Sequence, residues 1–135
     1  MGMFNVLGQV NYLAVLVAGA CHMVVSLAWF HARLFGREWE RLTGQELKPA
    51  PPWIGPGIVG HMLIALALAA LIKVSGAGSI GDALLVAVFV WVGFVVTLET
   101  GELLWEKIPV KLFLIRIGNH LVALCVTSLV LAVWK

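Results

Sequence analysis

The sequence predicts an all-α integral membrane protein, folded as a bundle of four transmembrane helices. Hydrophobic residues make up 61% of the 135 residues and charged residues 12%, whereas an ordinary globular domain carries about 25% charged residues. A soluble domain of this size could not hide so much apolar surface, and the mean hydropathy of +1.02 agrees. The apolar residues form long continuous runs, unlike the short alternating strands of a membrane barrel. We therefore exclude a soluble enzyme and a nucleic-acid-binding protein.

A helix needs about 20 apolar residues to cross the hydrocarbon core, and four segments reach that length. We predict spans at about 10–32, 54–74, 80–104 and 110–134, within a single transmembrane domain over residues 1–135. Pro56 is expected in the first turn of the second span, where its missing N–H has no helical partner. Ser79 and Asp82 predict a capping box at the start of the third span.

The one long connection, 33–53, lies between the first and second spans. Its first part, 34–47, places Phe35, Trp39 and Leu42 on one face and predicts a short interfacial helix. Three prolines follow, at 49, 51 and 52. They predict an extended segment, because the residue before a proline is disfavoured in the α region.

The distribution of Lys and Arg predicts that both termini lie outside the cytoplasm, since basic loops are retained inside. The connections after the first and third spans carry Arg33, Arg37, Arg41, Lys48, Lys107 and Lys111. The opposite side carries Lys73 and Lys135. No basic residue precedes the first apolar run, so we expect no secretory signal peptide. Cys21 and Cys125 lie within spans and are expected to be free thiols.

Three histidines fall at a similar depth in three different spans: His22, His61 and His120. At about 1.5 Å per residue they lie about 10–13 Å from the cytoplasmic ends of their spans. We predict these three as cofactor-binding candidates, because imidazoles could ligate a transition metal or a haem iron, or relay protons. The alternative is that each one hydrogen-bonds a neighbouring helix and only holds the bundle together. His31, at the end of the first span, is expected at the interface.

A second group is acidic. Glu99, Glu102 and Glu106 are spaced three and four residues apart and share one helix face. Arg116 lies at a depth similar to that of Glu99. We predict a buried Glu99–Arg116 ion pair, because an unpaired buried charge would be far costlier. The alternative is a vestibule, including Glu102, through which a cation or proton enters.

A faint internal repeat is also present. Residues 24–27 resemble 95–98, and residues 58–61 resemble 117–120. This similarity predicts two parallel helical hairpins related by an axis along the membrane normal.

Several segments resemble one family of small bacterial membrane proteins. They are Asn11–Ala18, Leu27–Phe30, Leu34–Trp39, Leu42–Gly44, Gly81–Leu84, Trp91–Phe94, Lys111–Ile115 and His120–Leu121. Together they cover nearly the whole chain and are similar to the family named domain of unknown function 1761. The resemblance implies four spans and a bacterial inner membrane, and implies no activity. The chain departs from the family pattern at Gly101 and Lys107, and His22 and His61 are not part of that pattern.

These observations lead to three functional hypotheses. The first is a non-enzymatic helix bundle that acts by self-association, with a homodimer favoured, or within a membrane assembly. Its partners would be the lipid bilayer and copies of itself, and no nucleic acid is expected. The second is a metal or haem protein that uses the three histidines. The third is proton-coupled permeation of a small solute. The sequence does not identify a cofactor or a ligand.

Overall fold

The computed structural model describes residues 2–47 and 51–134, without the side chains of Pro51 and Trp53. Every regular element in these ranges is helical. In chain order they are α1 (Met3–Leu7), α2 (Tyr12–Trp29), α3 (Gly36–Thr43), α4 (Pro51–Val74), α5 (Ile80–Val90), the π-helix η1 (Trp91–Val96), α6 (Thr97–Trp105) and α7 (Val110–Val133). Four stretches of the described chain are long and apolar enough to cross a membrane: Tyr12–Trp29, Ile54–Val74, Ile80–Trp105 and Val110–Val133. The predicted four-helix transmembrane bundle is confirmed.

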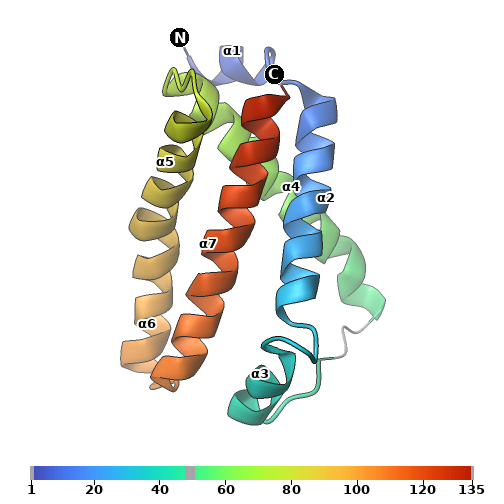
Figure 1. Ribbon diagram of the computed structural model, residues 1–135, viewed down its shortest axis with the longest axis vertical. Coiled ribbons are helices and arrows are strands. Elements are labelled where there is room, and N and C mark those ends of the chain that lie inside the picture. The colour runs from blue at the N-terminus through green and yellow to red at the C-terminus, as the bar shows by residue number, and fades with distance from the viewer. Residues whose placement is uncertain (1, 48–50, 135) are drawn as a thin grey trace.

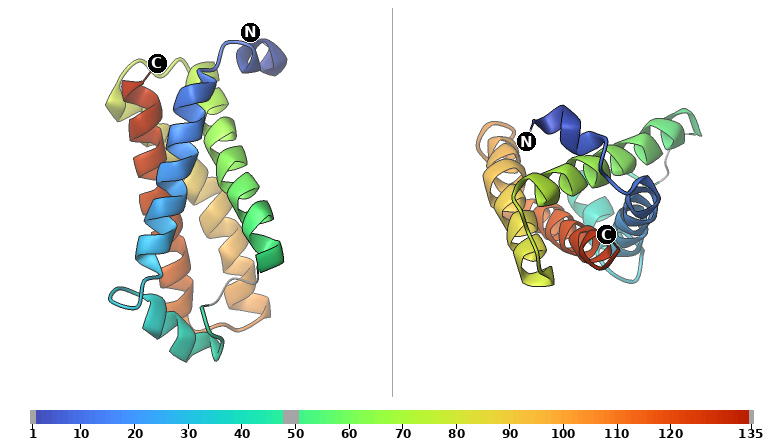
Figure 2. Two further views of the ribbon diagram at one scale, coloured as in Figure 1. Left: turned by 90° about the vertical axis from the view of Figure 1, so that its right-hand side faces the viewer. Right: turned by 90° about the horizontal axis from the view of Figure 1, so that it is seen from above.

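The long helices run in alternating directions, so both chain ends lie at one end of the bundle and α3 lies at the other (Figure 1). We call these the terminal end and the α3 end. Helix α7 makes most of the interhelical contacts, with α2 on one side and α5 on the other, and α4 packs mainly against α2. The view along the bundle shows α7 between α5 and α2 (Figure 2).

The core is built largely from small side chains, which let helices approach closely in lipid. It includes Ala14 and Ala18 from α2, Ala65 and Ala69 from α4, and Ala87 from α5. Leu68, Leu124 and Leu131 complete this core, and many other large apolar residues lie exposed on the outer faces, where lipid would cover them in a membrane.

Helix α4 packs against the bundle mainly from His61 onward. Ala65, Leu68 and Ala70 are buried, whereas the residues from Ile54 to Val59 are exposed. Its first half leans away from the other helices toward the α3 end (Figure 1). This divergence separates the start of α4 from α7 near the α3 end (Figures 1 and 2).

The predicted capping box is present at the start of α5. The Ser79 hydroxyl accepts a hydrogen bond from the Asp82 amide at 3.1 Å, and the Asp82 carboxylate accepts one from the Ser79 amide at 3.2 Å. Gly76, with φ of +71°, makes the turn between α4 and α5, because glycine adopts this left-handed conformation without a steric penalty.

The proline segment was predicted wrongly. Helix α4 begins at Pro51, so Pro52 is helical rather than extended, and Pro56 lies inside the helix, one turn later than expected. A proline in the first turn removes no helical hydrogen bond, because the first four amides of any helix lack intrahelical partners. Pro56 deprives the Pro52 carbonyl of its partner, and the exposure of Pro52 lets water replace it.

The short helix predicted in the long connection is present as α3 but is shorter than predicted, because Gly44 ends it in the left-handed conformation at φ +70°. Lys48, Pro49 and Lys135, which entered the sequence predictions, lie outside the described residues.

Candidate functional site

Two of the three predicted histidines are in direct contact. His22 Nδ1 of α2 lies 2.8 Å from His61 Nδ1 of α4, and the two ring centroids are 5.0 Å apart. One Nδ1 must carry the proton and the other must accept the hydrogen bond, because two N–H donors cannot share it. The sequence positions His22 by its four-residue steps from Ala14 and Ala18, which lie on the same buried face of α2.

The second nitrogen of His22 is unusual. His22 is only 2% exposed, and its Nε2 atom is buried without a hydrogen-bond partner among the described residues. Nearly all buried polar atoms in proteins have a partner, so an exception calls for an explanation such as a proton-handling role. Among the described residues, the pair therefore has a hydrogen bond between its Nδ1 atoms and no partner for Nε2 of His22.

His120 of α7 is the third histidine and is partly buried. It lies close enough to His22 and His61 to act on both electrostatically, but no hydrogen bond joins it to them in the described part of the chain. Within residues 2–47 and 51–134, no three His, Cys, Asp or Glu side chains are grouped to hold a metal ion. Two nitrogens on one tetrahedral ion would lie about 3.3 Å apart, given metal–nitrogen bonds of about 2.0–2.1 Å. The 2.8 Å contact suits a shared proton better.

A charged cluster lies nearer the α3 end. Arg116 Nη1 of α7 is 3.8 Å from Glu99 Oε2 and 3.9 Å from Glu102 Oε2, both on α6. These are ion contacts beyond hydrogen-bond distance. The side chains of Arg116, Glu99 and Glu102 are 29%, 21% and 40% exposed, so the cluster is half-buried. Just beyond the span, a hydrogen bond from the Glu102 carboxyl raises the pKa of Glu106. Two carboxylates, those of Glu99 and Glu102, therefore contact one guanidinium.

The π-helix η1 turns the glutamates toward α7. Glu99 follows the buried Ala87 by twelve residues, and would point about 120° away from it in a continuous α-helix at about 100° per residue. A π-turn contains one extra residue, which reduces the angle to about 20°. The Thr97 hydroxyl donates to the Gly93 carbonyl at 2.7 Å, and the Thr100 hydroxyl donates to the Val96 carbonyl at 2.6 Å. These two carbonyls of η1 therefore have hydrogen-bond partners.

Two tryptophans attach neighbouring helices to α7 beside Arg116. Trp29 Nε1 donates to the Ile115 carbonyl at 3.0 Å, and Trp91 Nε1 donates to the Ile117 carbonyl at 2.7 Å. Neither contact was predicted from the sequence. For Trp91 the available signal was its position inside a span, because a buried indole N–H needs a partner, whereas Trp29 is the last residue of its span and gave no such signal.

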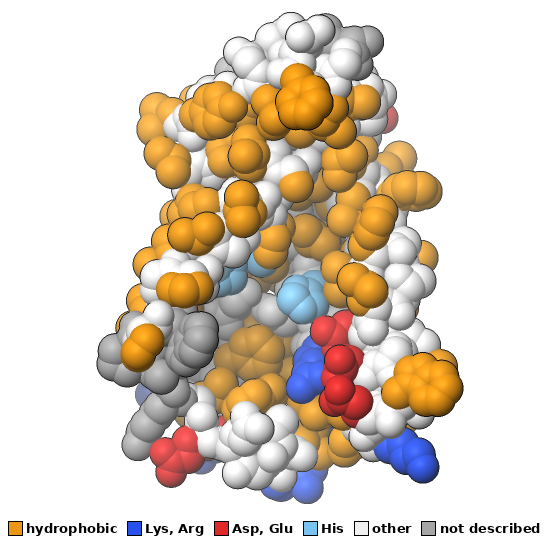
Figure 3. Space-filling view, turned by 180° about the vertical axis from the view of Figure 1, so that it is seen from behind, with side chains coloured by type: hydrophobic (Ala, Val, Ile, Leu, Met, Phe, Trp, Pro, Cys, Tyr) orange, Lys and Arg blue, Asp and Glu red, His pale blue; other side chains and the backbone are white. Residues whose placement is uncertain are grey.

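These groups meet on one hollowed face of the molecule. Figure 3 shows histidine side chains at the inner end of the hollow and acidic and basic side chains along one wall. We call this feature the polar crevice and define it by His22, His61, His120, Arg116, Glu99 and Glu102. It lies where the first half of α4 leaves the bundle (Figure 1).

Helix α3 is attached beside this opening. Glu38 accepts hydrogen bonds from Arg41 within α3 and lies 3.0 Å from Lys111 Nζ of α7. The hydrogen bonds from Arg41 and Lys111 lower the pKa of Glu38 to about 2. The contact ties α3 to the start of α7.

Comparison with known proteins adds a family and no activity. A family model described as protein of unknown function (DUF1761) matches residues 13–132. No curated protein and no solved structure matches the chain. The matched region contains all six residues of the polar crevice.

Proposed function

Because the chain belongs to the DUF1761 family, whose function is unknown, we propose its function from the polar crevice: a non-enzymatic membrane protein that couples proton movement to the passage of a small solute. The observation that carries the proposal is the 2.8 Å hydrogen bond between His22 and His61 at the inner end of the crevice. Ionisable groups inside a membrane are costly and commonly mark ion pathways and proton relays.

The histidine pair has the chemistry of a relay. A neutral imidazole accepts a proton at one ring nitrogen and releases one from the other. In a pair joined through Nδ1, a proton taken up at one Nε2 shifts the shared hydrogen and frees the proton at the opposite Nε2. The unpartnered Nε2 of His22 supports this role.

The charge of the crevice indicates the class of solute. Two carboxylates, Glu99 and Glu102, face the single guanidinium of Arg116. An excess of carboxylate in a partly desolvated wall favours a cation over an anion. A small cation is therefore the proposed solute. The histidine-ligated metal or haem hypothesis stays a prediction, and the short contact between the two Nδ1 atoms does not favour it.

A single copy leaves the crevice open on the side of α4. We propose that a second copy completes the wall, which retains the homodimer hypothesis. The orientation proposed from the Lys and Arg distribution opens the crevice to the cytoplasm, with both termini outside. The family resemblance supports a bacterial inner membrane.

Proton flux into proteoliposomes that enclose a pH-sensitive dye tests the proposal. His61→Ala should lower the flux about 100-fold, the lower range for loss of a positioned proton-transfer group. Glu99→Gln, which preserves side-chain shape, should weaken solute-dependent flux. His31→Ala is the matched control, because His31 is exposed and its ring accepts a hydrogen bond from the nearby Arg33 amide. Flux in correctly folded His61→Ala equal to that of His31→Ala would refute the relay.

A further inference from the structure

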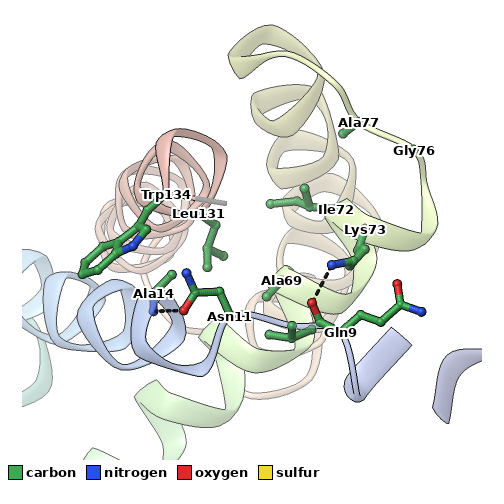
Figure 4. Close-up of a pocket in the computed structure, with 11 residues that line it drawn as sticks. Gln9, Asn11, Ala14, Ala69, Ile72, Lys73, Gly76, Ala77, Leu131 and Trp134 are labelled. Atoms are coloured by element: carbon green, nitrogen blue, oxygen red, sulfur yellow. Dashed lines mark hydrogen bonds between the residues drawn. The ribbon is translucent and has the colours of Figure 1, made fainter. Parts of the chain in front are cut away.

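A pocket of about 300 Å³ lies at the terminal end, opposite the polar crevice. The start of α2, the end of α4, the turn after α4 and the end of α7 enclose it (Figure 4). Its floor is apolar and includes Ala14, Ala69, Ile72 and Leu131, and its polar rim includes Lys73. An apolar cavity with a few polar groups at its mouth is the usual form of a small-molecule site.

Lys73 brings a positive charge to the pocket. Its Nζ donates to the backbone carbonyl of Gln9 at 2.5 Å, which is a neutral acceptor. No Asp or Glu in the described ranges lies within ion-pair distance of Lys73. The carboxylate of Asp82, at the same end, accepts the amides of Gly78 and Ser79 in the capping box. Because an ammonium group has three donors, Lys73 can bind an anion from the pocket.

Asn11 offers a second donor. Its Oδ1 accepts the Ala14 amide at 3.1 Å as the cap of α2, which leaves the amide nitrogen directed toward the α7 side of the pocket (Figure 4). Trp134 also lines the rim, and tryptophan is enriched at the headgroup level of membranes. The polar mouth of the pocket therefore lies where lipid headgroups would be.

An apolar groove of about 320 Å³ lies between α2 and α4. Its lining residues are Tyr12, Val15, Leu16, Ile58, Val59, Met62, Leu63 and Leu66. Leu66 is three residues before Ala69 of the pocket, so the groove begins within one helical turn of it. From Leu66 to Ile58 the groove follows α4 for about 12 Å into the membrane.

We propose that the pocket and the groove bind one anionic phospholipid, with its phosphate on Lys73 and Asn11 and an acyl chain along the groove. A free phosphate ion would use only the pocket mouth, whereas a phospholipid fills both features. Basic pockets between transmembrane helices are known to take anionic headgroups. The proposal goes beyond the proton-coupled function, because this site lies at the other end of the bundle.

Native mass spectrometry of the full-length protein in detergent tests this site, with dioleoyl phosphatidylglycerol, dioleoyl phosphatidylcholine and inorganic phosphate as probes. We expect phosphatidylglycerol to bind about fivefold more tightly than phosphatidylcholine, from about 1 kcal/mol per lysine near a membrane surface. Lys73→Gln should abolish that preference. Lys107→Gln, which removes one charge at the α3 end, should preserve it.

Two further outcomes would overturn the proposal. Equal binding of the two lipids to the wild-type protein would show that the site does not recognise an anionic headgroup. Inorganic phosphate could also bind as tightly as phosphatidylglycerol, with the same dependence on Lys73. That result would identify a site for a free anion and exclude a phospholipid as its occupant. A short-chain dihexanoyl phosphatidylglycerol should bind more weakly than the dioleoyl form, and equal binding would exclude the groove. Circular dichroism of Lys73→Gln checks that the variant is folded.

Discussion

Arg116 is the side chain in the charged cluster whose loss should destabilise the bundle most. It lies 3.8 Å from Glu99 and 3.9 Å from Glu102, distances at which one ion contact is worth about 4 kcal/mol at an effective dielectric constant of 20. The three side chains are 21–40% exposed. Screening therefore places the effect between that of a surface pair, about 0.2–1 kcal/mol, and that of a broken buried pair, about 3–5 kcal/mol.

From these limits we expect Arg116→Met to destabilise the protein by about 2 kcal/mol, because it leaves the carboxylates uncompensated. Glu99→Gln should cost less, about 1 kcal/mol, since Arg116 keeps Glu102. The double variant should cost about 2 kcal/mol rather than the sum of about 3 kcal/mol, because it removes both members of the contact. The measurement is reversible unfolding of the purified chain in mixed micelles, followed by tryptophan fluorescence.

Arg37→Gln is the control for a lost positive charge. Arg37 is exposed in α3, and the ion pairs of the described residues do not include it. The Arg37→Gln variant should therefore be as stable as the wild-type protein. Effects of Arg116→Met and Glu99→Gln that add within about 0.5 kcal/mol would show that the two side chains are not coupled, and the explanation of the cluster would be wrong.

Three further predictions follow from the fold. Deletion of Val92, an exposed residue of η1, should turn Glu99 by about 100° away from α7. A cysteine cross-link between α6 and α7 would detect this rotation. Unchanged cross-linking would contradict the role of the π-helix. Gly118→Ala should destabilise the bundle by about 1–3 kcal/mol, because a Cβ atom there would lie 2.9 Å from the Trp29 ring, and a thermal shift of the purified variant would measure it. The attachment of α3 to α7 should be intact above about pH 4.5 and lost as the pH falls toward 2, because hydrogen bonds lower the pKa of Glu38 to about 2. Hydrogen exchange of the α3 amides would measure this loss. Glu38→Gln should abolish the pH dependence.

The sequence predicted the charged and histidine residues of the crevice but not their arrangement. Depth along each span placed His22 and His61 at a similar level, and the structure shows them in contact. Depth carries no information on the distance between helices, so it could not separate this pair from His120. In the same way, the spacing of the glutamates predicted a shared face, but the direction of that face depends on one extra residue in η1.

Two features of the fold were not predicted correctly from the sequence, and each has a physical reason. Proline was interpreted as a signal for extended structure at 51 and 52, whereas both residues fit the first turn of α4. The tryptophans at 29 and 91 were not recognised as anchors to α7, because the carbonyls that they bind, at Ile115 and Ile117, are distant in the chain. Propensity describes single segments and cannot identify such partners.

Composition and hydrophobic run length alone determined that this chain has four helices long and apolar enough to cross a membrane, because so much continuous apolar surface is unfavourable in water. The capping box at Ser79 and Asp82 was also predictable from the sequence, since both of its hydrogen bonds join residues close together in the chain. Only the tertiary structure decided that α4 leaves the bundle at the α3 end, that two imidazoles share a hydrogen bond and that Arg116 faces two glutamates. Each of these depends on how helices tilt and rotate against one another, and that is set by packing between residues far apart in the sequence.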